Sequence, residues 1–271
     1  LMAGIGACNL IVDEIAANIS NCGEALTTYL ELFDKGLTKD RLLKSTSESV
    51  RIEKMTGATP ANMLLFGTPS KLLDGGSTET LLMELLDMGY ARRCFFGFSR
   101  HSTKIKNLSA DEVMQQLFDT NGDACLDSIA DKLGLLADPI NVNKVITLNQ
   151  ENAKYLIEYR LDCERRAEVF SENESIARAE LEHRYFKALK LAGAYAFYDG
   201  SPEITQEHLE HAIKLAEDSG AAFSQLLTPE RPYTKLAKYL AQCKSDVTLA
   251  DLDEDLPCFK GSKSTKDDMI L

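Results

Sequence analysis

The alternation of short apolar runs with amphipathic stretches over residues 1–107 constrains the fold of this chain most. Three runs of four or five residues lie beside turn residues: Asn9–Val12, Met63–Phe66 and Cys94–Phe98. Runs of this length are typical of buried parallel strands. Between them, Ile15–Phe33 and Thr78–Met88 carry apolar residues at helical spacing. This order of strands and helices predicts an α/β layer.

Residues 108–228 are predicted to be helical almost throughout. Ser109 and Glu112 have the spacing of a capping box, and later stretches carry Ala and Leu at intervals of three and four residues. The further predicted helices are Gln150–Phe170, Glu174–Tyr198 and one that Thr205 caps and that runs through Ala216. We therefore expect a fold that is α/β first and mostly α afterwards.

The tail, residues 229–271, is predicted to form three short helices. They are Tyr233–Cys243, Thr248–Asp253 and one from Ser262 onward. Their spacing resembles a helix-turn-helix or winged-helix domain cut before its wing, and a generic three-helix appendage is the alternative. The apolar residues expected to form its core are Leu236, Ala237, Leu240, Val247, Leu249, Leu252 and Leu256.

Charge and cysteine content exclude several classes of protein. The chain of 271 residues has 30 basic and 42 acidic residues, a net charge of −12, which excludes a wholly basic nucleic-acid coat. Residues 108–228 hold 11 basic and 22 acidic side chains, and we expect most of them on solvated helix faces. The seven cysteines form no C-x-x-C pair, so we expect neither a zinc cage nor a disulfide framework.

The two ends of the sequence indicate whether the chain enters a membrane and whether it is part of a longer protein. The apolar start, Leu1–Val12, has no basic flank and is too short to cross a bilayer, so no membrane segment is expected. A reducing cytoplasm fits the cysteine usage best. The chain begins inside a predicted strand and ends inside a predicted helix, and we expect it to be a piece of a longer protein.

Two adjacent carboxylates, Asp13 and Glu14, follow the first predicted strand. In a P-loop ATPase, an acid at this place holds the water shell of Mg²⁺ and a second acid orients the attacking water. Adjacent side chains of an extended chain point to different sides, which suits one to the metal and one to the water. The plain alternative is a strand that ends at the protein surface.

The order of the elements that follow carries a family resemblance. Thr68 lies just beyond the second predicted strand, and Arg92 and Arg93 directly precede the third. Here the sequence resembles the second half of an AAA+-like motor: a Walker B strand, a sensor strand, and an arginine finger before the last strand. It is similar to minichromosome-maintenance helicases. In the segments Leu64–Pro69 and Gly89–Arg93 it most resembles phage and prophage primase/helicase proteins.

The resemblance implies ATP and Mg²⁺ as cofactors and a role for each matching residue. Asp13 would hold Mg²⁺, Glu14 would activate water and Thr68 would sense the γ-phosphate. Arg93, with Arg92 as the alternate, would act on the ATP of a neighbouring copy, which implies a homo-oligomer. In the helical lid of this family a further arginine contacts the nucleotide. The candidates for that sensor are Arg178 and Arg184, and the sequence does not decide between them.

One departure from the family pattern limits the activity expected of this chain. No G-x-x-x-x-G-K-[ST] loop occurs anywhere in it, and neither Gly4–Gly6 nor Gly75–Thr78 contains the lysine. Without that loop, the backbone amides and the lysine that hold the phosphates are missing. We expect residues 1–271 alone to bind ATP poorly and to hydrolyse none.

The resemblance also implies a DNA partner, single-stranded or forked, in the cytoplasm of a bacterial host. Two small basic patches are candidates for weak, salt-sensitive contacts with phosphates. A solvated helix cap is the alternative for both. The candidate residues are Lys104, Lys106, Lys260, Lys263 and Lys266.

Two other function classes compete with the ATPase hypothesis. A non-catalytic helical scaffold or DNA-binding module would need no phosphate loop at all. A metal-dependent hydrolase built on Asp13 and Glu14 lacks nearby histidines, and we expect His208 and His211 on a helix exterior without a third ligand. The ATPase hypothesis rests on one spatial expectation: the acidic pair and the arginine pair cap neighbouring parallel strands at the same edge of one sheet.

Overall fold

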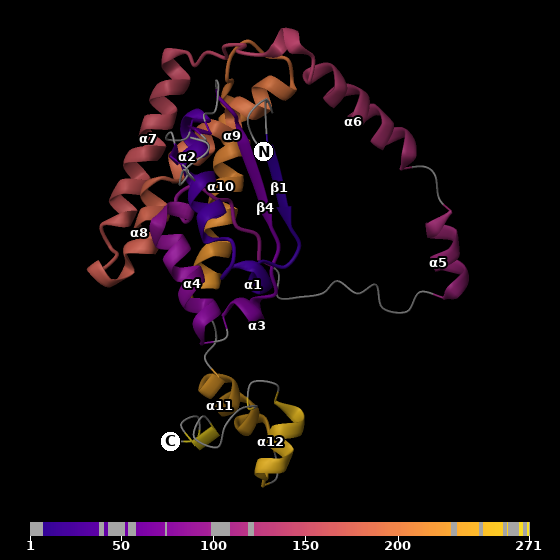
Figure 1. Cartoon of the computed structure of the whole chain (residues 1–271), viewed down its shortest axis with the longest axis vertical. Coiled ribbons are helices and arrows are strands. Elements are labelled where there is room, and N and C mark those ends of the chain that lie inside the picture. The colour runs from indigo at the N-terminus through magenta and orange to yellow at the C-terminus, as the bar shows by residue number, and fades with distance from the viewer. Residues whose placement is uncertain are drawn as a thin grey trace, which may run out of the picture. The chain divides into compact units, whose positions relative to one another are not determined.

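A computed structural model gives the three-dimensional structure of the chain (Figure 1). The residues that it describes are 8–37, 41–42, 52–53, 58–73, 75–98, 109–118, 122–228, 232–243, 246–256, 259, 266–267 and 270. The chain divides into two compact units, residues 1–224 and residues 225–271. Within the described ranges, no helix has both the length and the apolar character needed to cross a membrane.

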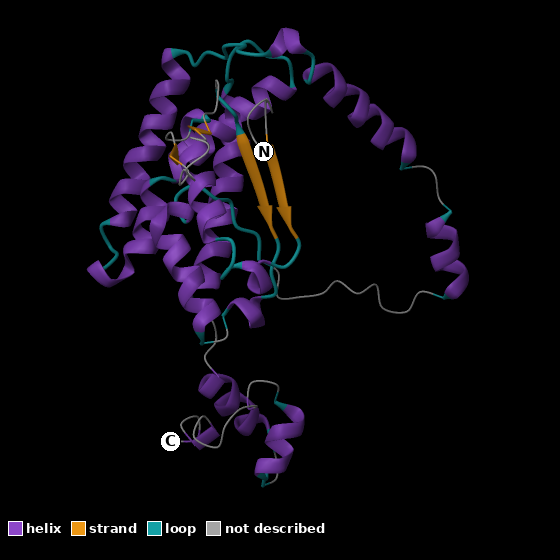
Figure 2. Cartoon of the chain, in the orientation of Figure 1, coloured by secondary structure: helices purple, strands orange, loops and turns teal. Residues whose placement is uncertain are grey.

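A two-stranded parallel sheet lies in the first unit (Figure 2). Strand β1 (Cys8–Val12) pairs with β4 (Ala61–Leu65), so that Ile11 lies opposite Leu64. The apolar runs that predicted the first two strands therefore form parallel neighbours, and this part of the prediction is confirmed. A second, antiparallel pair joins the two-residue strands β2 (Arg41–Leu42) and β3 (Ile52–Glu53).

The predicted third strand is wrong, because Cys94–Phe98 forms no strand. This segment packs instead against the helices of the first unit. The Phe96 amide donates a hydrogen bond of 2.7 Å to Ser219 Oγ, and the Phe96 ring lies 4.3 Å from that of Phe223. Side chains of α10 (Gln206–Leu227) thus accept a backbone hydrogen bond from this apolar segment and cover its ring, although the sequence pattern alone assigns the segment to a sheet.

Short helices follow the strands of the small sheet along the chain. Predicted helix 15–33 is interrupted by a turn that the Asn21 amide closes onto the Asn18 carbonyl, and Asn is a typical turn residue. The elements of this part are α1 (Ile15–Asn18), α2 (Gly23–Lys35), α3 (Pro69–Leu72), α4 (Ser77–Leu85) and the π-helical turn η1 (Leu86–Tyr90). Gly36 ends α2 in the left-handed conformation, with φ of 65°.

The remainder of the first unit is helical, as predicted. The Ser109 capping box is present, and Asn149 caps the long helix predicted from Gln150. Predicted helix 174–198 is divided at His183, and the helix after Thr205 extends to Leu227. The elements are α5 (Ala110–Leu117), α6 (Asp123–Leu136), η2 (Pro139–Asn141), α7 (Gln150–Ala167), η3 (Glu172–Glu174), α8 (Ser175–Glu182), α9 (Arg184–Tyr198) and α10 (Gln206–Leu227).

Alanines dominate the core between α7, α9 and α10. Small side chains at the contact let neighbouring helices approach closely, and Leu156 and Leu209 fill the space that remains. The fully buried alanines are Ala188, Ala192, Ala196, Ala212 and Ala216. A bridge between Thr147 and Glu203 ties the segment before α7 to the segment before α10.

The second unit contains α11 (Pro232–Gln242) and α12 (Leu249–Asp255). Its core consists of Leu236, Leu252 and Phe259. Of the predicted apolar set, Ala237, Leu240 and Leu249 are exposed rather than buried. The start of the helix predicted from Ser262 lies outside the described residues, so the winged-helix resemblance stays a prediction.

Candidate functional site

The carboxyl edge of the parallel sheet brings two predicted site residues together. Strands β1 and β4 run in the same direction, so their ends reach the same edge, beside α1 and α3 (Figure 1). There Thr68 Oγ1 donates a hydrogen bond of 3.1 Å to Glu14 Oε2. Lys71 Nζ lies 3.8 Å from the same carboxylate oxygen. The spacing of 54 positions in sequence thus becomes a direct contact.

The backbone around this contact is rigidly paired. The Phe66 amide donates to the Val12 carbonyl, and the Ile15 amide donates to the Phe66 carbonyl, both at 2.8 Å. Ile15 is buried, and this anchors the start of α1 directly behind Glu14. The geometry of Glu14 and Thr68 therefore follows from the sheet and not from a mobile loop.

The two carboxylates at this edge differ in environment. Asp13 is exposed, whereas Glu14 is half-buried and its Oε1 atom is buried without a hydrogen-bond partner. The exposed Asp13 carboxylate suits a magnesium ion that keeps most of its waters and binds mainly to substrate phosphates. Among the described residues, no cluster of three or more His, Cys, Asp or Glu side chains is placed to hold a metal ion without such a substrate.

Arg93 contacts α2, and no described contact joins Arg92 or Arg93 to Asp13, Glu14 or Thr68. The Arg93 guanidinium is 5.5 Å from the centre of the Phe33 ring, near the C-terminal end of α2. Just beyond that end, the Gly36 carbonyl accepts a hydrogen bond from the Thr59 amide, and Thr59 precedes the start of β4. Arg93 and the η1 turn before it therefore lie along α2, where the Tyr90 hydroxyl also donates to the Leu26 carbonyl.

The expectation that the acidic and arginine pairs cap one edge is thus wrong. Its premise was a third parallel strand beginning at Cys94, and that strand is absent from the described chain. The π-helical turn η1 redirects the backbone instead, with Gly89 at φ of 125°. Arg93 Nη1 donates to the Gly89 carbonyl at 3.3 Å, and Arg92 Nε is buried without a hydrogen-bond partner.

Both candidate lid arginines are engaged in ion pairs within the helical part. Arg178 is exposed and pairs with Glu182 one turn along α8, at 2.8 Å. Arg184 is buried between Glu180 and Glu217, at 2.5 and 2.8 Å. The donors of Arg184 are thus used inside the protein, which argues for a structural role of that side chain.

A buried charge cluster was missed by the sequence analysis. Lys187 Nζ contacts Glu180 Oε1 at 2.5 Å and donates a hydrogen bond of 3.0 Å to the Cys94 carbonyl. Burial lowers the pKa of the Lys187 ammonium, and the Glu180 carboxylate opposes that shift. Glu180, Arg184 and Lys187 are spaced by four and three residues on an Ala-rich stripe, and this pattern was the available signal.

The outer part of the same cluster is centred on Glu217. Arg166 approaches both of its oxygens, at 2.9 and 3.2 Å, and the Tyr159 hydroxyl donates to it at 2.7 Å. Burial alone would raise the pKa of this carboxyl. The hydrogen bonds from Arg166 and Tyr159 and the charge of Arg184 outweigh burial and hold the pKa below its usual value.

The predicted nucleic-acid lysines are only partly within the described chain. Lys104, Lys106, Lys260 and Lys263 lie outside the described residues. Lys266 pairs with both oxygens of Asp253, at 2.5 and 2.6 Å, and its ammonium lies 5.6 Å from the Phe259 ring centre. In this arrangement Lys266 stabilises the second unit.

His208 is buried and not on the helix exterior as predicted. Its Nδ1 accepts a hydrogen bond of 3.1 Å from the Thr205 amide at the start of α10, and its Nε2 lies 3.2 Å from Asp199 Oδ2. Both ring nitrogens therefore have partners, and His208 acts as a helix cap. A pocket of about 370 Å³ beside it also involves His211 and Tyr195.

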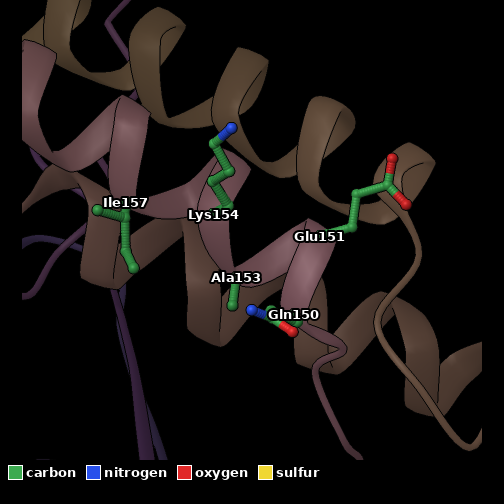
Figure 3. Close-up of a pocket in the computed structure, with 5 residues that line it drawn as sticks. All are labelled: Gln150, Glu151, Ala153, Lys154 and Ile157. Atoms are coloured by element: carbon green, nitrogen blue, oxygen red, sulfur yellow. The ribbon is translucent and has the colours of Figure 1, made fainter.

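A shallow depression of about 640 Å³ lies on α7 (Figure 3). All of its lining side chains come from the first turns of that helix. In Figure 3, Lys154 and Glu151 extend from the side of the helix opposite to Ala153. A site made by one helix brings no groups together from different elements. The contact between Glu14 and Thr68 is the better candidate for chemistry.

The chain was compared with protein-family models and with curated proteins, and neither comparison finds a match.

Proposed function

We propose that this chain is part of a replicative P-loop ATPase of the phage primase/helicase kind, which couples ATP hydrolysis to DNA unwinding. The single observation that carries the proposal is the hydrogen bond from Thr68 to Glu14 across the carboxyl ends of two parallel strands. Ligands of open α/β sheets bind at this edge. A carboxylate that can orient water and a hydroxyl beside it are two of the groups that a P-loop ATPase places at this edge, in addition to its phosphate loop.

Each group has a defined task in this proposal. The Glu14 carboxylate accepts a hydrogen bond from the attacking water and orients it toward the γ-phosphate. Thr68 holds Glu14 Oε2 in place, so that the unpartnered Oε1 is the oxygen left for the water. Asp13, exposed beside them, would contact the water shell of Mg²⁺, which supplies charge neutralisation on the phosphates when bound.

The oligomer and the nucleic acid belong to the same proposal. Arg92 and Arg93 have no described contact with Glu14 or Thr68 of their own copy, so they would act on the ATP of an adjacent copy. DNA, single-stranded or forked, would be the substrate, in the cytoplasm. An arginine supplied by a neighbour contributes on the order of 10³–10⁵ in rate, which would make turnover depend on assembly.

The test uses the natural reading frame extended upstream until it includes a G-x-x-x-x-G-K-[ST] loop. We expect that longer protein to hydrolyse ATP, and Glu14→Gln to lower kcat by at least about 100-fold while nucleotide affinity is retained. Thr68→Ala should lower kcat by roughly 10-fold, because Glu14 loses its positioning hydrogen bond. The exposed Glu158→Gln is the matched control and should leave turnover unchanged.

Retained turnover in the Glu14→Gln protein would contradict the proposal. So would an upstream frame that contains no phosphate loop. In that case the second candidate, a non-catalytic helical interaction module, becomes the better explanation. The observation that favours it is the set of exposed apolar side chains on α5 and α6, including Leu117, Phe118 and Leu126.

A further inference from the structure

Lys71 is a charged residue at the carboxyl edge of the sheet that has no task in the proposed reaction. Its Nζ atom lies 3.8 Å from Glu14 Oε2, and its side chain is 66% exposed. A separation of 3.8 Å is longer than a hydrogen bond, and no described side chain accepts one from this ammonium. The three N–H donors of Lys71 are therefore available to a ligand that binds at this edge.

The short helix α3 presents Lys71 at a fixed place. The Thr68 carbonyl accepts hydrogen bonds from the amides of Lys71 and Leu72, at 2.9 and 3.0 Å. Leu72 is buried, and a Cβ atom at Gly67 would come within 2.6 Å of its Cδ1 atom and 3.0 Å of Ile15 Cγ2. This close packing holds α3 against the start of α1. The backbone of Lys71 is thus fixed beside the two carboxylates, while its exposed side chain can move.

The charges at this edge favour a role for Lys71 toward an anion. Asp13 and Glu14 supply two carboxylates, and Lys71 brings an ammonium to them. A phosphate that approaches two carboxylates is repelled unless cations compensate the charge. A lysine ammonium is a compact charge on a flexible stem and a common ligand of phosphate. Lys71 therefore supplies, from within the chain, part of the compensation that a nucleotide needs here.

The distances bring Lys71 within reach of the reacting phosphate. In the proposed reaction Glu14 Oε1 orients a water at about 2.6–3.2 Å, and that water attacks phosphorus from about 3–3.5 Å. The phosphorus atom then lies within roughly 7 Å of the Glu14 carboxylate. Lys71 Nζ is 3.8 Å from the other oxygen of the same carboxylate, and rotation of its flexible stem can carry the ammonium to a phosphate oxygen.

We propose that Lys71 binds the terminal phosphate of the nucleotide, so that it is a substrate-binding residue and not only an ion-pair partner of Glu14. Its ammonium exchanges the Glu14 carboxylate for a γ-phosphate oxygen, while the hydrogen bond from Thr68 keeps Oε2 in place. The ligand class is a nucleoside triphosphate, because a diphosphate has no phosphate at the place that Glu14 serves. This inference rests on the proposed function, which puts the γ-phosphate beside Glu14.

An ordinary surface ion pair is the alternative explanation of the contact between Lys71 and Glu14, and exposed pairs contribute little. The chain offers a matched comparison. Lys154 Nζ also lies 3.8 Å from a carboxylate oxygen, that of Glu158, and the Lys154 side chain is 78% exposed. Lys154 belongs to α7, and no described contact joins it to Glu14. An effect that appears at Lys71 and not at Lys154 therefore reports on the ligand and not on the loss of a surface charge.

Nucleotide affinity tests the inference without turnover. Calorimetric titration of the upstream-extended protein in the presence of Mg²⁺ measures the Kd of ADP and of adenylyl imidodiphosphate, a non-hydrolysable analogue of ATP. We expect Lys71→Met to weaken binding of the analogue at least about 10-fold and of ADP less than about 3-fold, because only the analogue has a terminal phosphate for the ammonium. Lys71→Arg keeps the charge and should stay within about 3-fold for both nucleotides. Lys154→Met should bind both as the wild type does.

The possible failures are distinguishable. Unchanged affinity of Lys71→Met for the analogue, with or without a lower kcat, would overturn the inference, since Lys71 would then act only through Glu14 or not at all. An equal loss for ADP and the analogue, or an equal loss in Lys154→Met, would also overturn it. An extended protein that binds neither nucleotide would overturn the proposed function, and this inference with it. Circular dichroism confirms that each variant remains folded.

Discussion

Lys187 and Glu180 are only 2% and 1% exposed, which is unusual for ionisable side chains. Each is compensated, because Glu180 receives Arg184 as well and Lys187 also reaches the Cys94 carbonyl. A buried pair of this kind adds little over an apolar pair, but the loss of one partner leaves a charge stranded. The cluster therefore holds the Cys94 segment in one position.

Removing one partner from this buried pair should cost more than the intact pair contributes. Lys187→Met should lower the free energy of unfolding by about 3 kcal/mol, because Glu180 loses a partner and the Cys94 carbonyl loses a donor. Urea titration measures the change. Hydrogen exchange at the Phe96 amide should also accelerate, since its segment is no longer anchored.

The control for this variant is Arg178→Met, which breaks the exposed pair with Glu182 on the same set of helices. Exposed pairs are screened by water, and little change in unfolding is expected. If both variants lost the same free energy of unfolding, the Lys187 pair would contribute no more than an exposed ion pair. The buried cluster would then not hold the Cys94 segment in place.

At the level of elements, helix ends determine where the sheet begins. Gly36 ends α2 in the left-handed conformation, and its position lies against the backbone of Thr59, just before β4. A side chain at residue 36 would place Cβ 2.8 Å from the Thr59 nitrogen. Backbone atoms cannot yield as a flexible side chain can, so this helix end and the start of β4 tolerate only glycine.

We therefore expect Gly36→Ala to lower the free energy of unfolding by about 1–3 kcal/mol, since both the positive φ and the close backbone oppose it. Gly193→Ala, within α9, is the opposite case, because its nearest neighbour is the Ile204 Cδ1 atom at 4.0 Å. That change should raise stability by about 0.5–1 kcal/mol. Thermal unfolding of the two proteins checks both signs.

For the whole molecule, the division into residues 1–224 and 225–271 predicts separable stability. The second unit depends on a small core in which Leu252 is 5% exposed and packs with Leu236 and Phe259. Few buried side chains make such a unit marginal, so one deletion removes a large share of its stability.

Leu252→Ala should thus raise hydrogen-exchange rates across α11 and α12 by at least about 30-fold, as expected for a cavity that costs 2–5 kcal/mol. Rates in α7 and α9 should stay as in the wild type. Leu249→Ala, at an exposed position in the same helix, should leave α11 and α12 protected. Faster exchange in α7 after Leu252→Ala would show that the two units unfold together.

The sequence by itself determined the helices with strong caps, such as those after Ser109 and Thr248, and the two parallel strands ahead of Asp13 and Thr68. These depend on local periodicity and on short polar signals at the ends of elements. Parallel strand direction then places the strand ends that carry Glu14 and Thr68 at the same edge, and the structure shows the hydrogen bond between them.

Only the tertiary structure decided the packing of Cys94–Phe98, the contact of Arg93 with Phe33 and the burial of Lys187 and His208. An apolar segment reads the same in a sequence whether a strand or a set of helices covers it. A charged side chain on a helix likewise enters the core only if distant residues supply its partners. Such choices depend on which segments meet in space, and local patterns do not contain that information.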